Sequence, residues 1–253
     1  MRLPWLALVA VLLGPLSAAA EPVPRIAIII DDLGYQLEAG RRAIALPGPL
    51  SFAILPATPR GRVLAETAHR LGKEVLLHLP LQAIAHHDTA EPGAITLDMS
   101  HGVFRLAFAA ALDSVPYAIG VSGHRGSLLT RHPGHMQWLM EEIRSRDDLF
   151  FVDSFTTAKS IAMQIATETG VPAAKRDVFL DADRSPLSLA REFERLKNLA
   201  QQQGVAVAIG HPYPETLDFL ERVLPALAGD GFELIPVSEV LRTNVEPALV
   251  GKL

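Results

Sequence analysis

The chain has 253 residues, a formal net charge of −5 and no cysteine. Without cysteine it can form neither a disulfide framework nor a lipid-modified cysteine, so its own core must stabilise the fold, and a chain of this length can bury one. The acidic balance and the lack of a basic stripe argue against nucleic acid as a partner.

Residues 1–20 are predicted to be a secretory signal peptide. Arg2 precedes an apolar run from Leu3 to Leu16, and small residues at 17–20 offer a cleavage site before Glu21. The run is short for a membrane span and no later segment is long enough, so we expect no transmembrane domain after signal cleavage. An uncleaved N-terminal anchor is the alternative. The predicted location is the periplasm or outside the cell.

Residues 25–34 read Arg-Ile-Ala-Ile-Ile-Ile-Asp-Asp-Leu-Gly and are the most informative segment of the chain. The apolar run Ile26–Ile30 predicts a buried strand, which ends on two adjacent carboxylates, Asp31 and Asp32. Neighbouring acids repel each other, and a bound metal ion or a shared proton would relieve that repulsion. A helix cap before Tyr35 would explain one aspartate but not both, so we predict a functional role for the pair.

Strand-like apolar runs and amphipathic helical patterns alternate along residues 21–243, which we interpret as one domain followed by a loose C-terminal tail, residues 244–253. The alternation predicts a mainly parallel sheet, and about eight strands in this length favour a closed or distorted (β/α) barrel over an open sheet. After the first strand, the predicted strands are Ser51–Leu55, Glu74–Leu79, Ala118–Val121, Leu149–Val152, Asp177–Leu180, Val205–Ile209 and Glu233–Val237. The predicted helices are Arg60–Leu71, Val103–Leu112, Gly134–Arg146, Ser188–Gly204 and Tyr213–Leu227.

Metal-binding and proton-transfer side chains recur where the predicted strands end, which is where β/α proteins place their chemistry. The irregular segment His86–His101 is predicted to be a loop over this rim. Each side chain has a structural alternative, as a core histidine, a solvated turn residue or a cap of the following turn. Their occurrence at one rim beside the aspartate pair favours a functional site. These residues are His78, His124, Asp153, Asp181 and His211.

Several motifs, in a fixed order between about Pro24 and Val240, resemble the divergent polysaccharide deacetylase family, distant relatives of the NodB-type carbohydrate esterases. The resemblance implies an α/β fold of NodB-like type, a distorted (β/α) barrel of about seven to eight mainly parallel strands. It also implies a divalent metal at the rim, usually zinc. The motifs are Ile-Ile-Asp-Asp-Leu-Gly, His-Leu-Pro-Leu-Gln, Gly-His-Arg-Gly-Ser, Phe-Val-Asp-Ser-Phe-Thr, Arg-Asp-Val-Phe-Leu-Asp and Ile-Gly-His-Pro-Tyr-Pro-Glu-Thr-Leu.

Residue roles follow from the same resemblance. In the better-known deacetylases the first aspartate of the pair is the general base and the second binds metal, and these match Asp31 and Asp32. The next metal motif is His-x-x-x-His, whose first histidine matches His78 but whose second position is Gln82, a poor zinc ligand. The late-strand histidine that acts as general acid matches His211.

The remaining site residues are predicted around the fourth strand end and beyond it. His124 is the predicted replacement for the missing imidazole and completes the set of metal ligands. Ser127, with backbone N–H groups of the glycine turn, is predicted to hold the oxyanion of a tetrahedral intermediate. Arg125 stands where divergent relatives carry an apolar residue, and it joins Asp153 and Asp181 as a candidate contact to substrate.

The predicted function is hydrolysis of N- or O-acetyl groups on an envelope polysaccharide or peptidoglycan-type glycan by an exported, metal-dependent carbohydrate esterase. Asp31 would take a proton from the attacking water and His211 would return one to the leaving group. One alternative is a protein that keeps the fold without the chemistry and acts as a glycan-binding or envelope scaffold protein. Another is a metal-independent glycosidase that pairs Asp31 with Asp153 or Asp181.

Overall fold

The computed structural model describes residues 22–243 except 86–90, 92 and 147. The predicted signal peptide, the predicted C-terminal tail and part of the predicted loop over the rim lie outside the described residues. Within the described part of the chain, no helix combines the length and the apolar character needed to cross a bilayer.

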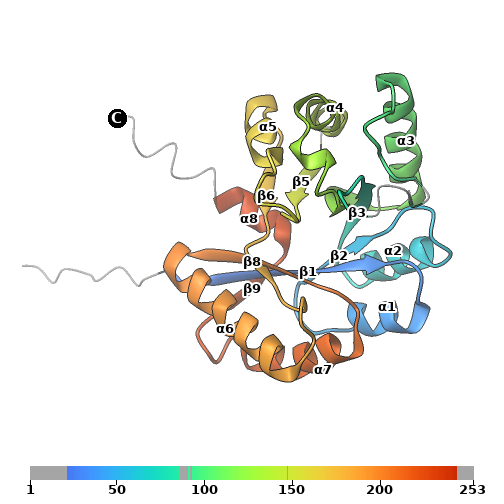
Figure 1. The fold of residues 1–253 in the computed structure, drawn as a ribbon. Coiled ribbons are helices and arrows are strands. Elements are labelled where there is room, and N and C mark those ends of the chain that lie inside the picture. The colour runs from blue at the N-terminus through green and yellow to red at the C-terminus, as the bar shows by residue number, and fades with distance from the viewer. Residues whose placement is uncertain (1–21, 86–90, 92, 147, 244–253) are drawn as a thin grey trace, which may run out of the picture.

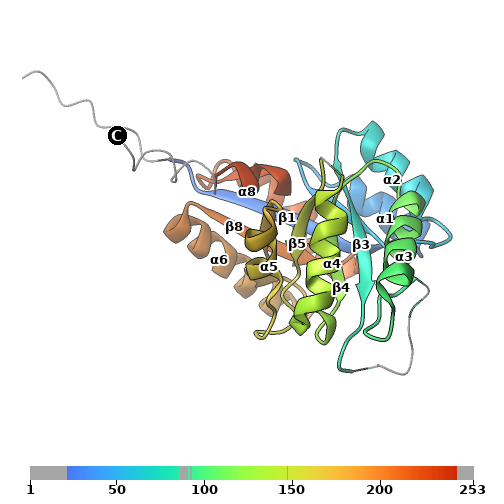
Figure 2. The same ribbon diagram turned by 90° about the horizontal axis from the view of Figure 1, so that it is seen from above.

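Nine strands in the described residues form one sheet, in which every pair of neighbours is parallel. The strands are β1 (Arg25–Leu33), β2 (Ser51–Ile54), β3 (Glu74–Leu81), β4 (Ala118–Arg125), β5 (Phe150–Asp153), β6 (Ala173–Lys175), β7 (Val178–Phe179), β8 (Val205–Gly210) and β9 (Glu233–Ile235). The order along the sheet is β6-β5-β4-β3-β2-β1-β8-β7, and β9 pairs with the first residues of β1. The sheet curls into a half-barrel, with β6 and β7 at its two ends (Figures 1 and 2).

Helices connect the strands and surround the curled sheet. In the described residues they are α1 (Leu37–Ile44), α2 (Gly61–Arg70), α3 (His101–Ser114), α4 (Pro133–Arg144), α5 (Ala162–Thr169), α6 (Pro186–Gln203), α7 (Pro214–Val223), α8 (Val237–Thr243) and two 3-10 turns, Leu129–Arg131 and Leu224–Ala226. Helices α3, α4 and α5 lie beside the half of the sheet that contains β3 to β6, whereas α6 and α7 lie on the side of β1 and β8 (Figure 1). This arrangement confirms the predicted distorted (β/α) barrel of mainly parallel strands.

The side chains of β1 show how the sheet separates two apolar layers. The even-numbered isoleucines of Ile26–Ile30 pack against the helices outside the sheet, while Ala27 and Ile29 face the interior. Helix α8 contacts β1 and β6 and contributes apolar side chains to the interior layer. The same alternation directs Asp31 into the interior at the carboxyl end of the strand.

Several element boundaries differ from those predicted. The sequence predicts that the first strand ends at Ile30, but its pairing with β2 continues to Leu33, so both aspartates lie inside β1. Strand β6 and helix α5 were not predicted, because elements this short carry too little of a periodic pattern. The predicted strand Glu233–Val237 is shorter, since Val237 begins α8.

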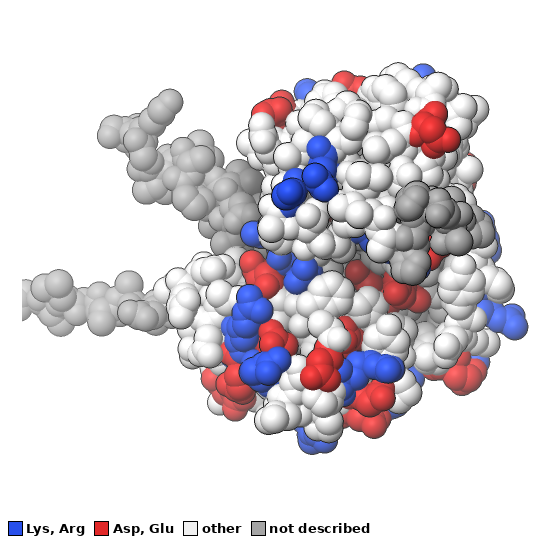
Figure 3. Space-filling view, in the orientation of Figure 1, with Lys and Arg blue, Asp and Glu red and all other residues white. Residues whose placement is uncertain are grey.

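Charged side chains are mixed on the surface. On the face shown in Figure 3, the described Lys and Arg side chains lie among Asp and Glu side chains and form no continuous basic stripe. A basic stripe is the usual electrostatic feature of a nucleic-acid-binding surface.

Candidate metal centre

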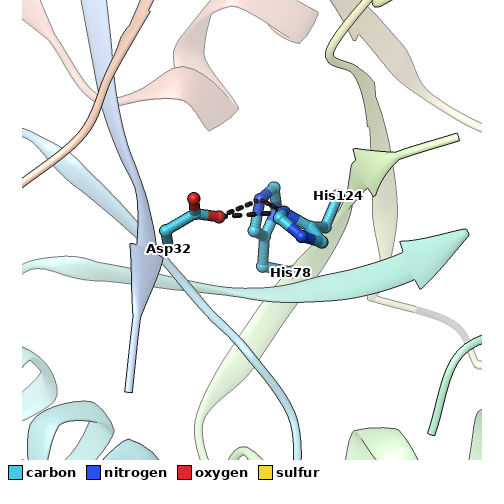
Figure 4. Close-up of side chains that lie close together, drawn as sticks. All are labelled: Asp32, His78 and His124. Carbon is cyan, nitrogen blue, oxygen red and sulfur yellow. Dashed lines mark hydrogen bonds and ion pairs between the residues drawn. The ribbon is translucent and has the colours of Figure 1, made fainter. Parts of the chain in front are cut away.

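Three side chains meet at the carboxyl ends of β1, β3 and β4: Asp32, His78 and His124 (Figure 4). Oδ1 of Asp32 lies 3.1 Å from Nε2 of His78 and 2.9 Å from Nδ1 of His124, and the two ring nitrogens are 3.2 Å apart. Zinc bonds to nitrogen and oxygen of about 2.0–2.2 Å place neighbouring ligands of a tetrahedral site roughly 3.4 Å apart. The three atoms are therefore spaced closely enough to share one small divalent cation.

The register of the sheet explains this convergence. On the neighbouring strands β3 and β4, His78 pairs with Ser122 and Pro80 pairs with His124. The two imidazoles therefore lie on the same, interior face of the sheet, offset by two residues along the strands. Strand β1 lies beyond β2 in the sheet order, and the curl of the sheet brings its end toward those of β3 and β4 (Figure 4).

An irregularity in β1 turns both aspartates toward the site. In a regular strand Asp31 and Asp32 would point to opposite faces. Asp32 instead has a φ of 61°, a left-handed conformation that is rare for residues other than glycine, and the pairing with β2 shifts register between Ile30 and Leu33. As a result Nε2 of His78 lies 3.5 Å from Oδ2 of Asp31 and 3.1 Å from Oδ1 of Asp32.

The carboxylates leave two oxygen atoms unsatisfied. Oδ1 of Asp31 and Oδ1 of Asp32 are both buried without a hydrogen-bond partner among the described residues. Oδ1 of Asp32 is close to two ring nitrogens, but these contacts do not have the direction of hydrogen bonds. Buried polar atoms without partners are costly, and a cation would satisfy the lone pairs that converge here. The donor set of one carboxylate and two imidazoles fits a zinc-type ion.

Burial and neighbouring charges give the adjacent aspartates different pKa values. Burial raises the pKa of Asp31 above its ordinary value. Burial acts in the same direction on Asp32, but the attraction of His124 and His78 outweighs it and holds the pKa of Asp32 well below the usual range. For His124, the attraction of Asp32 outweighs burial and raises the pKa. Asp31 is thus suited to take up a proton, whereas Asp32 stays ionised.

His211 stands at the same rim, after β8, and is held by Asp181. Nδ1 of His211 lies 2.9 Å from Oδ1 of Asp181, while Oδ2 of Asp181 accepts hydrogen bonds from the His211 backbone N–H at 2.6 Å and from Thr216 Oγ1 at 2.9 Å. Burial alone would lower the pKa of His211, but the hydrogen bond and charge of Asp181 outweigh it and raise the pKa to about 9. Nε2 of His211 faces Oδ2 of Asp32 at 3.8 Å. Asp181, predicted as a contact to substrate, lies buried behind His211.

Gln82, at the position where the resemblance predicts a second histidine, anchors a loop. Its Oε1 atom accepts a hydrogen bond from the backbone N–H of Leu97 at 2.8 Å, and its own backbone N–H donates to the carbonyl of Ile95 at 2.9 Å. The second imidazole of the cluster comes from His124 on β4. The side chain of Gln82 therefore has a structural partner away from the cluster.

The other predicted substrate contacts are engaged elsewhere. Oγ of Ser127 accepts a hydrogen bond from the backbone N–H of Ile84 at 3.1 Å. Asp153 is buried, and its two carboxylate oxygens accept hydrogen bonds from the Phe155 backbone N–H and from Ser160 Oγ. The structure brings neither Ser127 nor Asp153 into the described metal cluster, and Arg125 forms an ion pair outside it.

The sequence predictions did not include four residues near the site. Oγ of Ser122 lies 2.8 Å from Nδ1 of His78. Ser122 is two residues before His124 on one strand, so the sequence could have placed both side chains on the same face of the sheet. Glu91 contacts His124 from a loop, and the ring of Phe179 stacks on His211. The fourth residue is Arg176, which donates hydrogen bonds to the backbone carbonyls of Ser154 and Phe155 after β5. Its positive charge interacts with Asp153 and Asp31. Phe179 and Arg176 lie in the motif Arg-Asp-Val-Phe-Leu-Asp and Glu91 lies in the predicted loop over the rim, but only the fold shows which side chains they contact.

The chain is similar to proteins of one family. The sequence profile of the divergent polysaccharide deacetylases matches residues 28–241. The uncharacterised protein YibQ of Escherichia coli K12 is 36% identical over 228 residues, which cover 89% of this chain and 70% of that protein.

Solved structures share the fold. The uncharacterised protein ATU2773 from Agrobacterium tumefaciens C58 has a TM-score of 0.83 at 23% identity, covering 89% of this chain and 92% of that one. A mutant of the peptidoglycan deacetylase PdaC from Bacillus subtilis has a TM-score of 0.52 at 14% identity, covering 91% of this chain and 98% of that one. At these identities the likeness concerns the fold alone.

Proposed function

Because the chain belongs to the divergent polysaccharide deacetylase family, we propose that it is an exported, metal-dependent esterase that removes N- or O-acetyl groups from an envelope polysaccharide. The observation that carries the proposal is the cluster of Asp32, His78 and His124, with Asp31 and His211 beside it. Metal-assisted acyl hydrolysis uses a cation site, a group that accepts a proton and a group that donates one, and these residues could supply all three.

Asp32, His78 and His124 would hold the cation, which we propose to be zinc. When bound, it would polarise the acyl carbonyl and lower the pKa of the attacking water. The low pKa of Asp32 keeps this ligand ionised. The contact between Nδ1 of His78 and the hydroxyl of Ser122 supports a tautomer whose Nε2 lone pair faces the cluster.

Asp31 is the proposed general base. Its carboxylate lies beside His78 but keeps one oxygen without a hydrogen-bond partner among the described residues. Its raised pKa, which is due chiefly to burial, makes the carboxylate a better proton acceptor than an exposed aspartate. Asp31 would take the proton of the water as the new bond to the acyl carbon forms.

His211 is the proposed general acid. With a pKa of about 9 it is protonated at neutral pH, and Asp181 fixes its ring so that Nε2 faces the cluster. When the tetrahedral intermediate collapses, His211 would donate a proton to the departing sugar amine or alcohol. Asp181 is then a positioning residue for His211.

The sugar that leaves should bind next to His211, because His211 would donate a proton to it. A pocket of about 230 Å³ lies there and is lined by Asp32, Tyr35, His211 and Tyr213, among others. Tyrosine rings offer flat apolar faces with a polar tip, a surface suited to sugar rings. Peptidoglycan is the first glycan to test, since the Bacillus subtilis protein of similar fold is named a peptidoglycan deacetylase.

The two alternative functions, a glycosidase and a glycan-binding scaffold, have less support. A two-carboxylate glycosidase would need Asp153 or Asp181 as partner of Asp31, but Asp181 is bound to His211 and both oxygens of Asp153 accept internal hydrogen bonds. A glycan-binding scaffold would have no need of the paired base and acid.

Metal analysis of variants tests the proposal. The protein from residue 21 onward should bind one zinc per chain, and Asp32→Ala and His78→Ala should each lose it because each removes a ligand. Gln82→Ala is the control and should keep zinc, since its side chain bonds to the Leu97 backbone. Unchanged metal content in all three variants would contradict the proposed site.

Acetate release tests the reaction itself. The zinc-loaded protein should release acetate from N-acetylated chitooligosaccharides or purified peptidoglycan, lose this activity with a chelator and regain it with zinc. Glycan binding without acetate release from the zinc-loaded protein would favour the scaffold alternative.

A further inference from the structure

The imidazole of His124 is contacted at both ring nitrogens. Nδ1 faces Oδ1 of Asp32 at 2.9 Å and Nε2 of His78 at 3.2 Å, while Nε2 of His124 lies 3.1 Å from Oε2 of Glu91. The other carboxylate oxygen, Oε1 of Glu91, lies 2.9 Å from Nη2 of Arg125. Glu91 thus bridges the side chains of His124 and Arg125 at the end of β4.

A carboxylate beside Nε2 determines which ring nitrogen carries the proton. Because Glu91 accepts hydrogen bonds, the proton of a neutral His124 is best placed on Nε2, which leaves the lone pair of Nδ1 pointing at the cluster. A histidine ligand needs this tautomer, and a carboxylate partner also fixes the plane of the ring and increases the basicity of the ligating nitrogen. The contact therefore prepares His124 to bind a cation.

The partner of the other imidazole is of a different kind. Nδ1 of His78 contacts the hydroxyl of Ser122, a neutral and fully buried residue on β4. Glu91 is charged, its side chain is 30% exposed and it comes from the segment between β3 and α3. One ligand is thus held by the rigid sheet, and the other by a side chain outside it.

Backbone hydrogen bonds explain why this segment reaches His124. The N–H of Ile95 donates to the carbonyl of Pro80 at 2.8 Å, and the N–H of Gln82 donates to the carbonyl of Ile95 at 2.9 Å. Pro80 is the cross-strand partner of His124. A segment anchored along the end of β3 therefore carries Glu91 to the imidazole on the neighbouring strand.

We propose that Glu91 is a positioning residue of the metal centre, which holds His124 in its ligating tautomer and thereby increases the affinity for the cation. The inference rests on the proposed metal-dependent function, because it concerns the same three ligands. It gives Glu91 a task in metal binding and makes affinity depend on a residue that is not itself a ligand.

Zinc affinity of the full mature protein tests this role. In competition with a chromophoric chelator, Glu91→Ala should bind zinc about 10–100-fold more weakly than the wild type, the range typical for loss of such partners. Glu91→Gln keeps an acceptor oxygen and should lose less. Glu38→Ala is the matched control, since Glu38 pairs only with Arg41 on the exposed surface of α1 in the contacts described, and its affinity should equal that of the wild type.

A spectroscopic measurement separates positioning from a general loss of stability. The visible absorption bands of the cobalt-loaded protein should shift in Glu91→Ala and move back toward the wild type in Glu91→Gln, while the metal-free variants keep the wild-type melting temperature. Equal zinc affinity in the wild type and Glu91→Ala would overturn the role of Glu91 alone. Failure of the wild type to bind zinc would overturn the metal centre itself.

Discussion

Asp31 and Asp32 are neighbours in the chain, yet their surroundings separate their chemistry. Asp31 is buried, and burial is the main cause of its raised pKa, whereas two imidazoles hold Asp32 ionised. The left-handed backbone at Asp32 makes this arrangement possible, because it turns both carboxylates to one side of the sheet. The local strain is of the kind that functional sites retain when the surrounding structure supports it.

The pair of Asp181 and His211 predicts a measurable pH dependence in the metal-free protein. The pKa of His211, about 9 against an ordinary 6.5, means that protonation stabilises the folded state. This contribution is complete below about pH 6.5 and is lost as the pH rises through 9. Asp181→Asn should lower the pKa in an NMR titration and remove up to about 3 kcal/mol of this pH-dependent stability.

The difference in stability between wild type and Asp181→Asn should therefore shrink as the pH is raised to about 10, measured by urea unfolding at each pH. A His211 pKa that is the same in both proteins would show that Asp181 does not set the charge of this imidazole.

Much of the site was recognisable residue by residue, but not all of it. Asp31, His78 and His211 directly follow or interrupt apolar runs, so their place at strand ends can be read from the sequence. Glu91 lies in an irregular stretch and contacts His124 only because backbone hydrogen bonds fold that stretch along β3. A contact created by tertiary structure has no local signature.

At the scale of elements, the turn after β1 depends on a glycine. Gly34 has a φ of 141°, and a Cβ atom there would lie 2.1 Å from Oγ1 of Thr58. Gly34→Ala should therefore destabilise the protein by roughly 1–3 kcal/mol, measured by urea unfolding. Gly72→Ala is the control, because Gly72 also has a positive φ, of 67°, but open space around it. Equal losses in the two variants would show that the contact with Thr58 is unimportant.

The long elements of the fold were predictable, whereas some of the short ones were not. The isoleucines of β1 and the buried residues Leu64, Ala65 and Ala68 of α2 recur at the spacing of a strand and of a helix. Helix α6 begins after the capping residue Ser185 and ends at Gln203, before Gly204, whose φ is 81°. Strand β6 has three residues, which is too few for a period, whereas the two-residue strand β7 lies within the predicted strand Asp177–Leu180. The continuation of β1 past Ile30 depends on pairing with β2, which no local pattern encodes.

At the scale of the whole molecule, metal binding should be coupled to stability. The ligands come from three strands of one sheet, so an unfolded chain presents no assembled site. Zinc at 100 times its dissociation constant should add about 2.7 kcal/mol to the free energy of unfolding. For a protein of this size that corresponds to a rise of roughly 5–10 °C in melting temperature.

Calorimetry with and without zinc measures this shift, and His78→Ala should show none. A wild-type melting temperature that does not respond to zinc would mean that the cluster does not bind the ion in the folded state.

The proposed metal ligands and the proposed proton donor come from different stretches of the chain. Asp32, His78 and His124 all lie in β1 to β4, whereas Asp181 and His211 follow the strands that complete the half-barrel. In chain order, every proposed ligand therefore precedes the proposed acid. They meet at one rim only in the complete half-barrel, where β8 pairs with β1. A chain cut short after β4 would keep the proposed ligands but lose both His211 and the strand that supports β1.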